Sequence, residues 1–116
     1  MNAAAAAAVI DEILARGGDA DDVLRAVVAA LHDEAGYPWA GILFVESGGL
    51  ALGPEAGRTG TAERRTVPVT WQGERVAELA VEGAPPEDDP FLEHVASLVS
   101  GQCLVGWDTG GEPWNA

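Results

Sequence analysis

Two pairs of β-rich segments, each joined by a short turn that contains glycine, constrain this chain more than any other feature. The segments are 39–46 (WAGILFVE) with 49–53 (GLALG), and 65–71 (RTVPVTW) with 75–82 (RVAELAVE). The turns Ser47-Gly48-Gly49 and Gln72-Gly73-Glu74 separate the members of each pair, a pattern typical of antiparallel hairpins. The sequence therefore predicts two hairpins, and the aperiodic stretch 54–64 between them is predicted to be a loop.

Helical patterns flank the hairpins on both sides. Residues 2–16 are mostly strong helix formers, and a second amphipathic run begins near Asp19 and ends before Gly36. Apolar residues recur at helical spacing again after Pro90, on Phe91, Leu92, Val95, Leu98, Val99 and then Gln102 or Cys103. The order helix, helix, hairpin, hairpin, helix predicts an α+β two-layer domain in which helices back one face of a four-stranded antiparallel sheet.

Strand alternation assigns side chains to the two faces of that sheet. One face, turned toward the helices, is predicted to carry Ile42, Phe44, Val67, Val69, Ala77, Leu79 and Val81. The other face is predicted to carry Trp39, Leu43, Val45, Glu78, Ala80 and Glu82.

Composition limits the partners and cofactors. The 116 residues suffice for one domain, and 19 acids against 6 arginines, with no lysine, give a formal net charge of −13. Such a chain repels phosphate backbones and anionic membranes, so neither nucleic acid nor a membrane is expected as a partner. One cysteine and two widely separated histidines predict no metal site and no cofactor. The alanine-rich start lacks a basic region and is interrupted by Asp11 and Glu12, so a cytoplasmic location is expected.

The runs YPWAGILFVESGGLALGPEAG, TVPVTWQGERVAELAVEG and DPFLEHVASLVS, in this order, resemble the opening hairpin, closing hairpin and last helix of GAF domains. The chain is most similar to the free methionine-R-sulfoxide reductase group, which also has a tryptophan two residues before a glycine and a Leu-Gly-Pro ending. The resemblance implies a GAF/profilin-like fold. It divides the chain into an N-terminal helix (1–18), a truncated GAF-like domain (19–106) and a C-terminal tail (107–116).

The resemblance also implies a ligand site on the face of the sheet away from the helices, formed by aromatic residues of the first strand and carboxylates of the last. Trp39 and Glu82 match this pattern, whereas Leu43, Ala80 and Arg64 stand where it has an aromatic residue or an acid. Together with Glu78, these residues form the candidate ligand- or partner-binding set. Arg64 has two interpretations: with Arg65 it grips an anionic ligand, or it pairs with Glu82 or Glu78 across the strands, which we prefer.

Two functions follow from these observations. In the reductases a long lid between the hairpins carries the reactive cysteines, whereas 54–64 is short and has none. We therefore expect a non-enzymatic GAF-like sensory or interaction module that binds a partner, itself or a small molecule on a shortened sheet face. The alternative is a redox enzyme similar to the free methionine sulfoxide reductases that uses Cys103. This cysteine lies on or beside the apolar stripe of the last helix, which predicts a buried structural thiol.

Two further expectations concern contacts. The alanine-rich first helix, and the habit of GAF domains to pair through terminal helices, predict a homodimer. Without a lid, an apolar patch around Trp39 is expected to be partly uncovered, and Trp39 is expected to pack under a second subunit, a ligand, or the tail with Trp107 and Trp114.

Overall fold

The two predicted hairpins form one antiparallel sheet in the computed structural model, which describes residues 3–46, 49–60 and 62–103. The strands are β1 (Trp39–Glu46), β2 (Gly49–Gly57), β3 (Arg64–Trp71) and β4 (Glu74–Glu82). They lie in the order β2-β1-β4-β3, so the first strand of one hairpin pairs with the second strand of the other. β1 and β4 are central, whereas β2 and β3 are the edges of the sheet.

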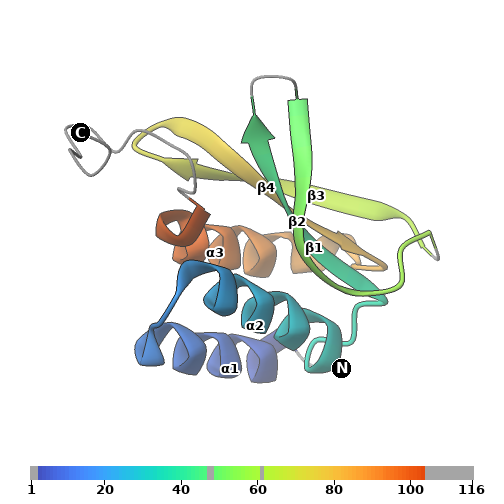
Figure 1. Ribbon diagram of the computed structural model, residues 1–116. Helices are drawn as coiled ribbons and strands as arrows, with labels where there is room; N and C mark the ends of the chain where they lie inside the picture. The colour runs from blue at the N-terminus through green and yellow to red at the C-terminus, as the bar shows by residue number, and fades with distance from the viewer. Residues whose placement is uncertain (1–2, 47–48, 61, 104–116) are drawn as a thin grey trace, which may run out of the picture.

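All three described α-helices lie on one side of this sheet (Figure 1). They are α1 (Ala3–Arg16), α2 (Ala20–Asp33) and α3 (Asp89–Val99). α2 and α3 pack against the strands, and α1 packs on α2 and α3 from the side away from the sheet. The predicted α+β architecture with helices on one face is therefore confirmed.

The hydrophobic core fills the space between the helices and the inner face of the sheet. Ile10 and Ile13 of α1 reach this core, which also contains the buried aliphatic side chains of α2 and α3. Ile42, Val67, Val69, Ala77, Leu79 and Val81 are buried there as the alternation predicted, with Phe44 packed against them. The register confirms the pattern, because Leu79 of β4 lies between its partners on the two neighbouring strands, Ile42 of β1 and Val67 of β3.

The structure corrects the segment between the hairpins. Residues 54–57 belong to β2 and Arg64 begins β3, so the connection is only 58–63 and not the predicted loop 54–64. The pattern was obscured because the register with β1 shifts between Gly41 and Leu43, where a bulge accommodates Gly53 and Pro54. Proline is tolerated here because β2 is an edge strand.

The backbone conformation of the turn between β3 and β4 explains why it contains a glycine. Gln72 and Gly73 have positive φ angles of 52° and 83°, as a two-residue hairpin turn of the type favoured by sheet twist requires. Glycine adopts this conformation without strain, which accounts for Gly73.

Two helix ends differ in detail from the sequence analysis. Asp19 precedes α2 as expected, but its side chain makes no capping hydrogen bond, and its carbonyl accepts from the Val23 amide at 2.9 Å. α3 stops at Val99 and the chain continues as a 3-10 turn, η2 (Ser100–Cys103). Gly101 lies within this turn, and glycine disfavours the α-helix.

Polar contacts join the start of α3 to the sheet and to the segment before β1. The Tyr37 hydroxyl donates to Asp88 at 2.7 Å, and the Arg65 guanidinium binds the Asp89 carboxylate at 2.6 and 3.1 Å. The hydrogen bond from Arg65 lowers the pKa of Asp89. No helix within the described ranges has the length and apolar character needed to cross a membrane.

Replacing a leucine with alanine is expected to lower the free energy of unfolding strongly in the core and only slightly on the outer face of the sheet. Leu31 of α2 is completely buried, whereas Leu52 of β2 is 53% exposed on the face away from the helices. We expect Leu31→Ala to lower the free energy of unfolding by about 2–5 kcal/mol, because it leaves a cavity. Leu52→Ala should change it by about 0.5 kcal/mol or less. Urea denaturation measures both, and equal losses would show that something covers Leu52.

Candidate ligand-binding site on the outer face of the sheet

Trp39, the first residue of the central strand β1, lies on the outer face, the face of the sheet turned away from the helices. Its indole lies across Gly41, the next residue on the same face of β1. A Cβ atom added at Gly41 would lie only 2.5 Å from Trp39 Cζ2, so no larger residue fits there without a shift. The Trp-Ala-Gly sequence is therefore a packing unit in which glycine makes room for the indole.

The edge of the indole is held by β2. Trp39 Nε1–H donates a hydrogen bond to Glu55 Oε1 at 2.7 Å. Glu55 lies opposite Gly41 in the β1–β2 register, so it stands beside the position that the glycine leaves open. The buried indole nitrogen thus has the partner that a buried Trp N–H ordinarily finds.

Glu82, opposite Trp39 on β4, is the one buried charged residue among the described residues. Its side chain is 4% exposed, and its contacts include Thr59 Oγ1 at 2.7 Å, the Gly60 amide at 2.8 Å and Arg64 Nη2 at 3.2 Å, all of which donate to the carboxylate. Burying a carboxylate costs much free energy unless it is paired and hydrogen-bonded. Thr59 and Gly60, from the connection between β2 and β3, supply hydrogen bonds of this kind to Glu82.

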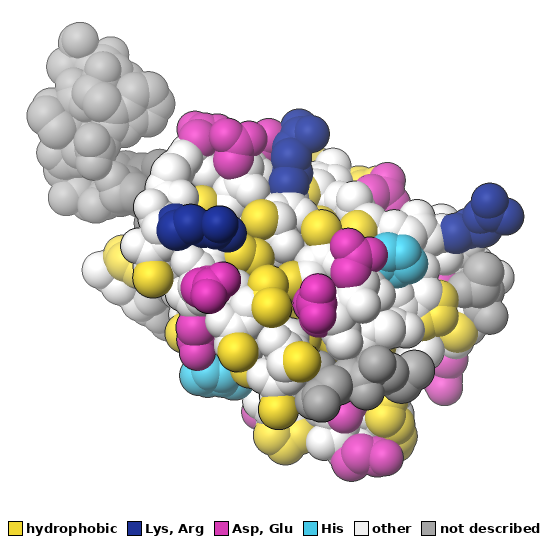
Figure 2. All heavy atoms as spheres, turned by 90° about the horizontal axis from the view of Figure 1, so that it is seen from below, with side chains coloured by type: hydrophobic (Ala, Val, Ile, Leu, Met, Phe, Trp, Pro, Cys, Tyr) yellow, Lys and Arg dark blue, Asp and Glu magenta, His cyan; other side chains and the backbone are white. Residues whose placement is uncertain are grey.

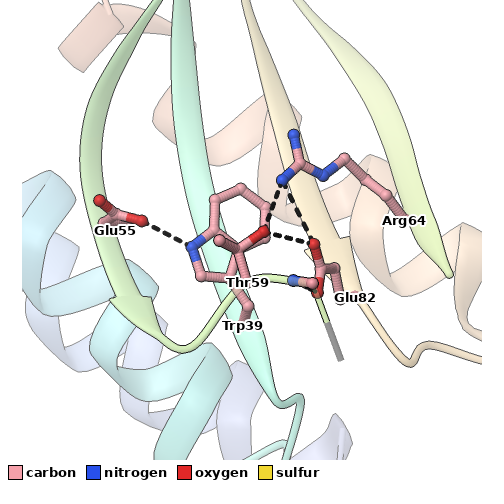
Figure 3. A network of polar contacts seen from close by, with 6 residues as sticks. Trp39, Glu55, Thr59, Arg64 and Glu82 are labelled. Atoms are coloured by element: carbon pink, nitrogen blue, oxygen red, sulfur yellow. Dashed lines mark hydrogen bonds and ion pairs between the residues drawn. The ribbon is translucent and has the colours of Figure 1, made fainter. Parts of the chain in front are cut away.

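Arg64 closes the arrangement from the β3 edge (Figure 3). Its Cζ lies 4.3 Å from the centroid of the Trp39 ring, a cation–π contact, and its Nη2 also donates to Thr59 Oγ1 at 2.9 Å. Only 1% of Trp39 is exposed. We call Trp39, Glu55, Thr59, Arg64 and Glu82 the Trp39 cluster.

The structure places all six sequence-predicted site residues on the outer face, and it brings three of them into contact. Trp39, Arg64 and Glu82 form the cluster, and the preferred pairing of Arg64 with Glu82 is confirmed. Glu78 instead pairs with Arg75 at 2.6 Å. The other two, Leu43 and Ala80, are half-buried and buried respectively.

Sequence reasoning missed Glu55, Thr59 and Gly60. All three fall in 54–64, which was assigned wholly to a loop, and strand alternation has no meaning within a loop. Continuing the alternation of Leu50 and Leu52 past Pro54 would place Glu55 on the inner face, and only the bulge at Gly53 and Pro54 turns it to the outer face.

The expected apolar patch on the outer face is present, but Trp39 is not part of it, because only 1% of this residue is exposed. Arg64 of the same chain lies over the indole, so neither a second subunit nor a ligand is needed to cover it. The exposed apolar side chains of this face lie further along β2, at Leu50 and Leu52. Trp107 and Trp114, considered as a cover, lie outside the described residues.

Cys103 lies on the opposite side of the sheet from the Trp39 cluster. It is buried in the core, where η2 contacts α2 and the inner face of the strands. Burial raises the pKa of this thiol to about 12, so the reactive thiolate is scarce at neutral pH.

Comparison with known proteins identifies the fold. No protein-family model matches the chain. No curated protein matches it either. The free methionine-R-sulfoxide reductase from Neisseria meningitidis, solved in complex with its substrate, has a TM-score of 0.73 at 16% identity, covering 87% of this chain and 89% of that one. The GAF domain of a phosphoenolpyruvate-protein phosphotransferase from Coxiella burnetii has a TM-score of 0.70 at 13% identity, covering 88% and 94%.

A third structure, the type II free methionine-R-sulfoxide reductase from Thermoplasma acidophilum, has a TM-score of 0.67 at 17% identity, covering 76% of this chain and 94% of that one. The chain therefore has a GAF-like fold. At these identities the likeness concerns the fold alone, and both reductases and other GAF domains share it.

The burial of Trp39 makes it a structural anchor of the outer face. We expect Trp39→Ala to lower the free energy of unfolding by about 3–5 kcal/mol, the usual cost of removing a large buried aromatic side chain. Trp71→Ala is the matched control, because Trp71 is 36% exposed, and its loss should be clearly smaller. Thermal and urea denaturation measure both. An unchanged stability in Trp39→Ala would refute the anchor role.

Proposed function

We propose that this protein is a non-enzymatic GAF-like sensory or interaction module that uses the outer face of its sheet for binding. The solved structures that share its fold include a GAF domain of a phosphotransferase and a segment of a methyl-accepting chemotaxis protein. The module binds its ligand or partner where the Trp39 cluster and the exposed leucines of β2 lie.

One observation carries this proposal: the single thiol of the chain is separated from the aromatic and acidic residues of the outer face. Sulfoxide reduction by a cysteine needs an accessible thiolate next to the bound substrate, and a further thiol to resolve the oxidised form. Cys103 is buried behind the sheet, and the sequence contains no second cysteine. The outer face thus has groups suited to binding but no nucleophile of this kind.

The alternative, a redox enzyme similar to the free methionine sulfoxide reductases, has one observation in its favour. Trp39 and Glu82, which match the pattern implied by the resemblance to that group, lie together on the outer face. Activity would require Cys103 to become accessible, because it is the only thiol that the chain supplies.

We expect no turnover of free methionine sulfoxide in the presence of a thiol reductant. The comparison is between the native protein and Cys103→Ser, with the rate of methionine formation as the measurement. A thiol-specific reagent should react with Cys103 slowly in native buffer and rapidly in denaturant, because burial and a raised pKa protect it. Turnover by the native chain that Cys103→Ser abolishes would establish the alternative instead.

Self-association is a second part of the proposal, through the outward side of α1. This side of the molecule shows apolar side chains interspersed with acidic ones (Figure 2). Ala8 and Ala15 are exposed on α1, and small side chains permit close approach of two helices. Ile10 and Ile13 of the same helix belong to the core, so deleting residues 1–16 would also damage the fold.

A point substitution tests the homodimer more cleanly. We expect Ala8→Glu to shift sedimentation toward the monomer, because it places a further negative charge between two chains that are already acidic. Thr70→Glu, on an exposed position of β3, is the control and should leave the mass in solution unchanged. A native protein that sediments as a monomer at high concentration would rule out the dimer.

A further inference from the structure

The Trp39 cluster contains two kinds of group that proteins use to recognise an organic cation, an aromatic ring and oxygen acceptors. The Trp39 ring offers its face, and the Glu82 carboxylate and Thr59 hydroxyl offer oxygen acceptors at its side. An aromatic face attracts a cation, and a buried carboxylate strengthens the attraction because little water screens it.

A cation already occupies this position, and it comes from the chain itself. The Arg64 guanidinium lies over the ring at 4.3 Å and contacts Glu82 at 3.2 Å and Thr59 at 2.9 Å. Arg64 lies on the solvent side of the cluster, because 42% of its side chain is exposed, whereas only 4% of the Glu82 side chain is exposed.

This difference in exposure determines how the cluster can open. Because 42% of the Arg64 side chain is exposed, water already solvates part of it, and this lowers the cost of moving it away from the edge of the sheet. Moving Arg64 away removes a positive charge from beside the buried Glu82 carboxylate, which is strongly unfavourable even though Thr59 and Gly60 still donate to it. Opening is therefore favourable only when another positive group takes the place of the guanidinium, and a neutral molecule does not meet this condition.

We propose that the Trp39 cluster is a binding site for a small organic cation with a guanidinium or alkylammonium head, and that Arg64 closes it by acting as an internal occupant. The inference rests on the proposed function, since it names the ligand class of the outer face. The net charge of −13 supports it, because an acidic surface raises the local concentration of cations. Arg64 sets the affinity, because a ligand must compete with it.

The test replaces Arg64 and supplies its head group from solution as propylguanidinium. We expect Arg64→Ala to bind propylguanidinium saturably, and at least about 10-fold more tightly than the native chain, in which a closed site reduces the apparent affinity. The readout is the NMR signal of the Trp39 indole N–H, assigned with Trp39→Phe, at constant ionic strength. If Arg64→Ala folds poorly, Arg64→Met keeps an apolar stem over the ring and removes only the charge.

Three controls make the result specific. Arg75→Ala removes a different arginine of the same sheet, paired with Glu78 at 2.6 Å, and should bind no better than the native chain. Propylurea, a neutral molecule of similar shape, should not bind. Adding Glu82→Gln to Arg64→Ala, with folding checked by circular dichroism, should abolish propylguanidinium binding.

Equal responses of Arg64→Ala and Arg75→Ala, equal binding of propylurea, or no saturable response in either Arg64 variant would overturn the cation site. None of these outcomes bears on the non-enzymatic character of the proposed function, which fails if the native chain turns over methionine sulfoxide through Cys103. The two hypotheses are thus tested separately.

Discussion

The burial of one carboxylate organises the outer half of this protein. Glu82 lies on a central strand, and its side chain is almost withdrawn from water, so it must find its hydrogen bonds within the chain. Thr59 and Gly60 provide two of them, which ties these two residues of the connection between β2 and β3 to the sheet. Arg64 provides the counter-charge, and in reaching Glu82 it also covers the ring of Trp39. The shape of the outer face therefore follows from satisfying a single buried charge.

The same sheet separates two kinds of chemistry. The inner face is an apolar core shared with three helices, and it encloses Cys103 so completely that the thiol stays protonated at neutral pH. The outer face carries an aromatic ring, carboxylates and arginines, all held by short contacts. A GAF-like fold with a short connection between its hairpins thus retains a polar, aromatic face without a thiol beside it. The proposal of a binding module rests on this separation.

Much of the fold was predictable from the sequence because strand and turn patterns are local. Period-two alternation placed Trp39, Glu78 and Glu82 on one face and Leu79 on the other, and the register confirms this assignment. The alternation failed at Pro54, where a bulge in an edge strand interrupts the pattern without ending the strand. Glu55 was missed for this reason, although it holds the indole nitrogen of Trp39.

By itself the sequence determined the two hairpins, the helices, the face to which each strand residue points and the presence of one thiol. These properties depend on neighbours in the chain, since propensity, turn chemistry and alternation act over a few residues. Tertiary structure alone decided that Arg64 lies over Trp39 and pairs with Glu82 rather than Glu78. Several acidic residues lie within reach of an arginine at that strand end, and only the three-dimensional arrangement shows which carboxylate is buried and in need of a partner.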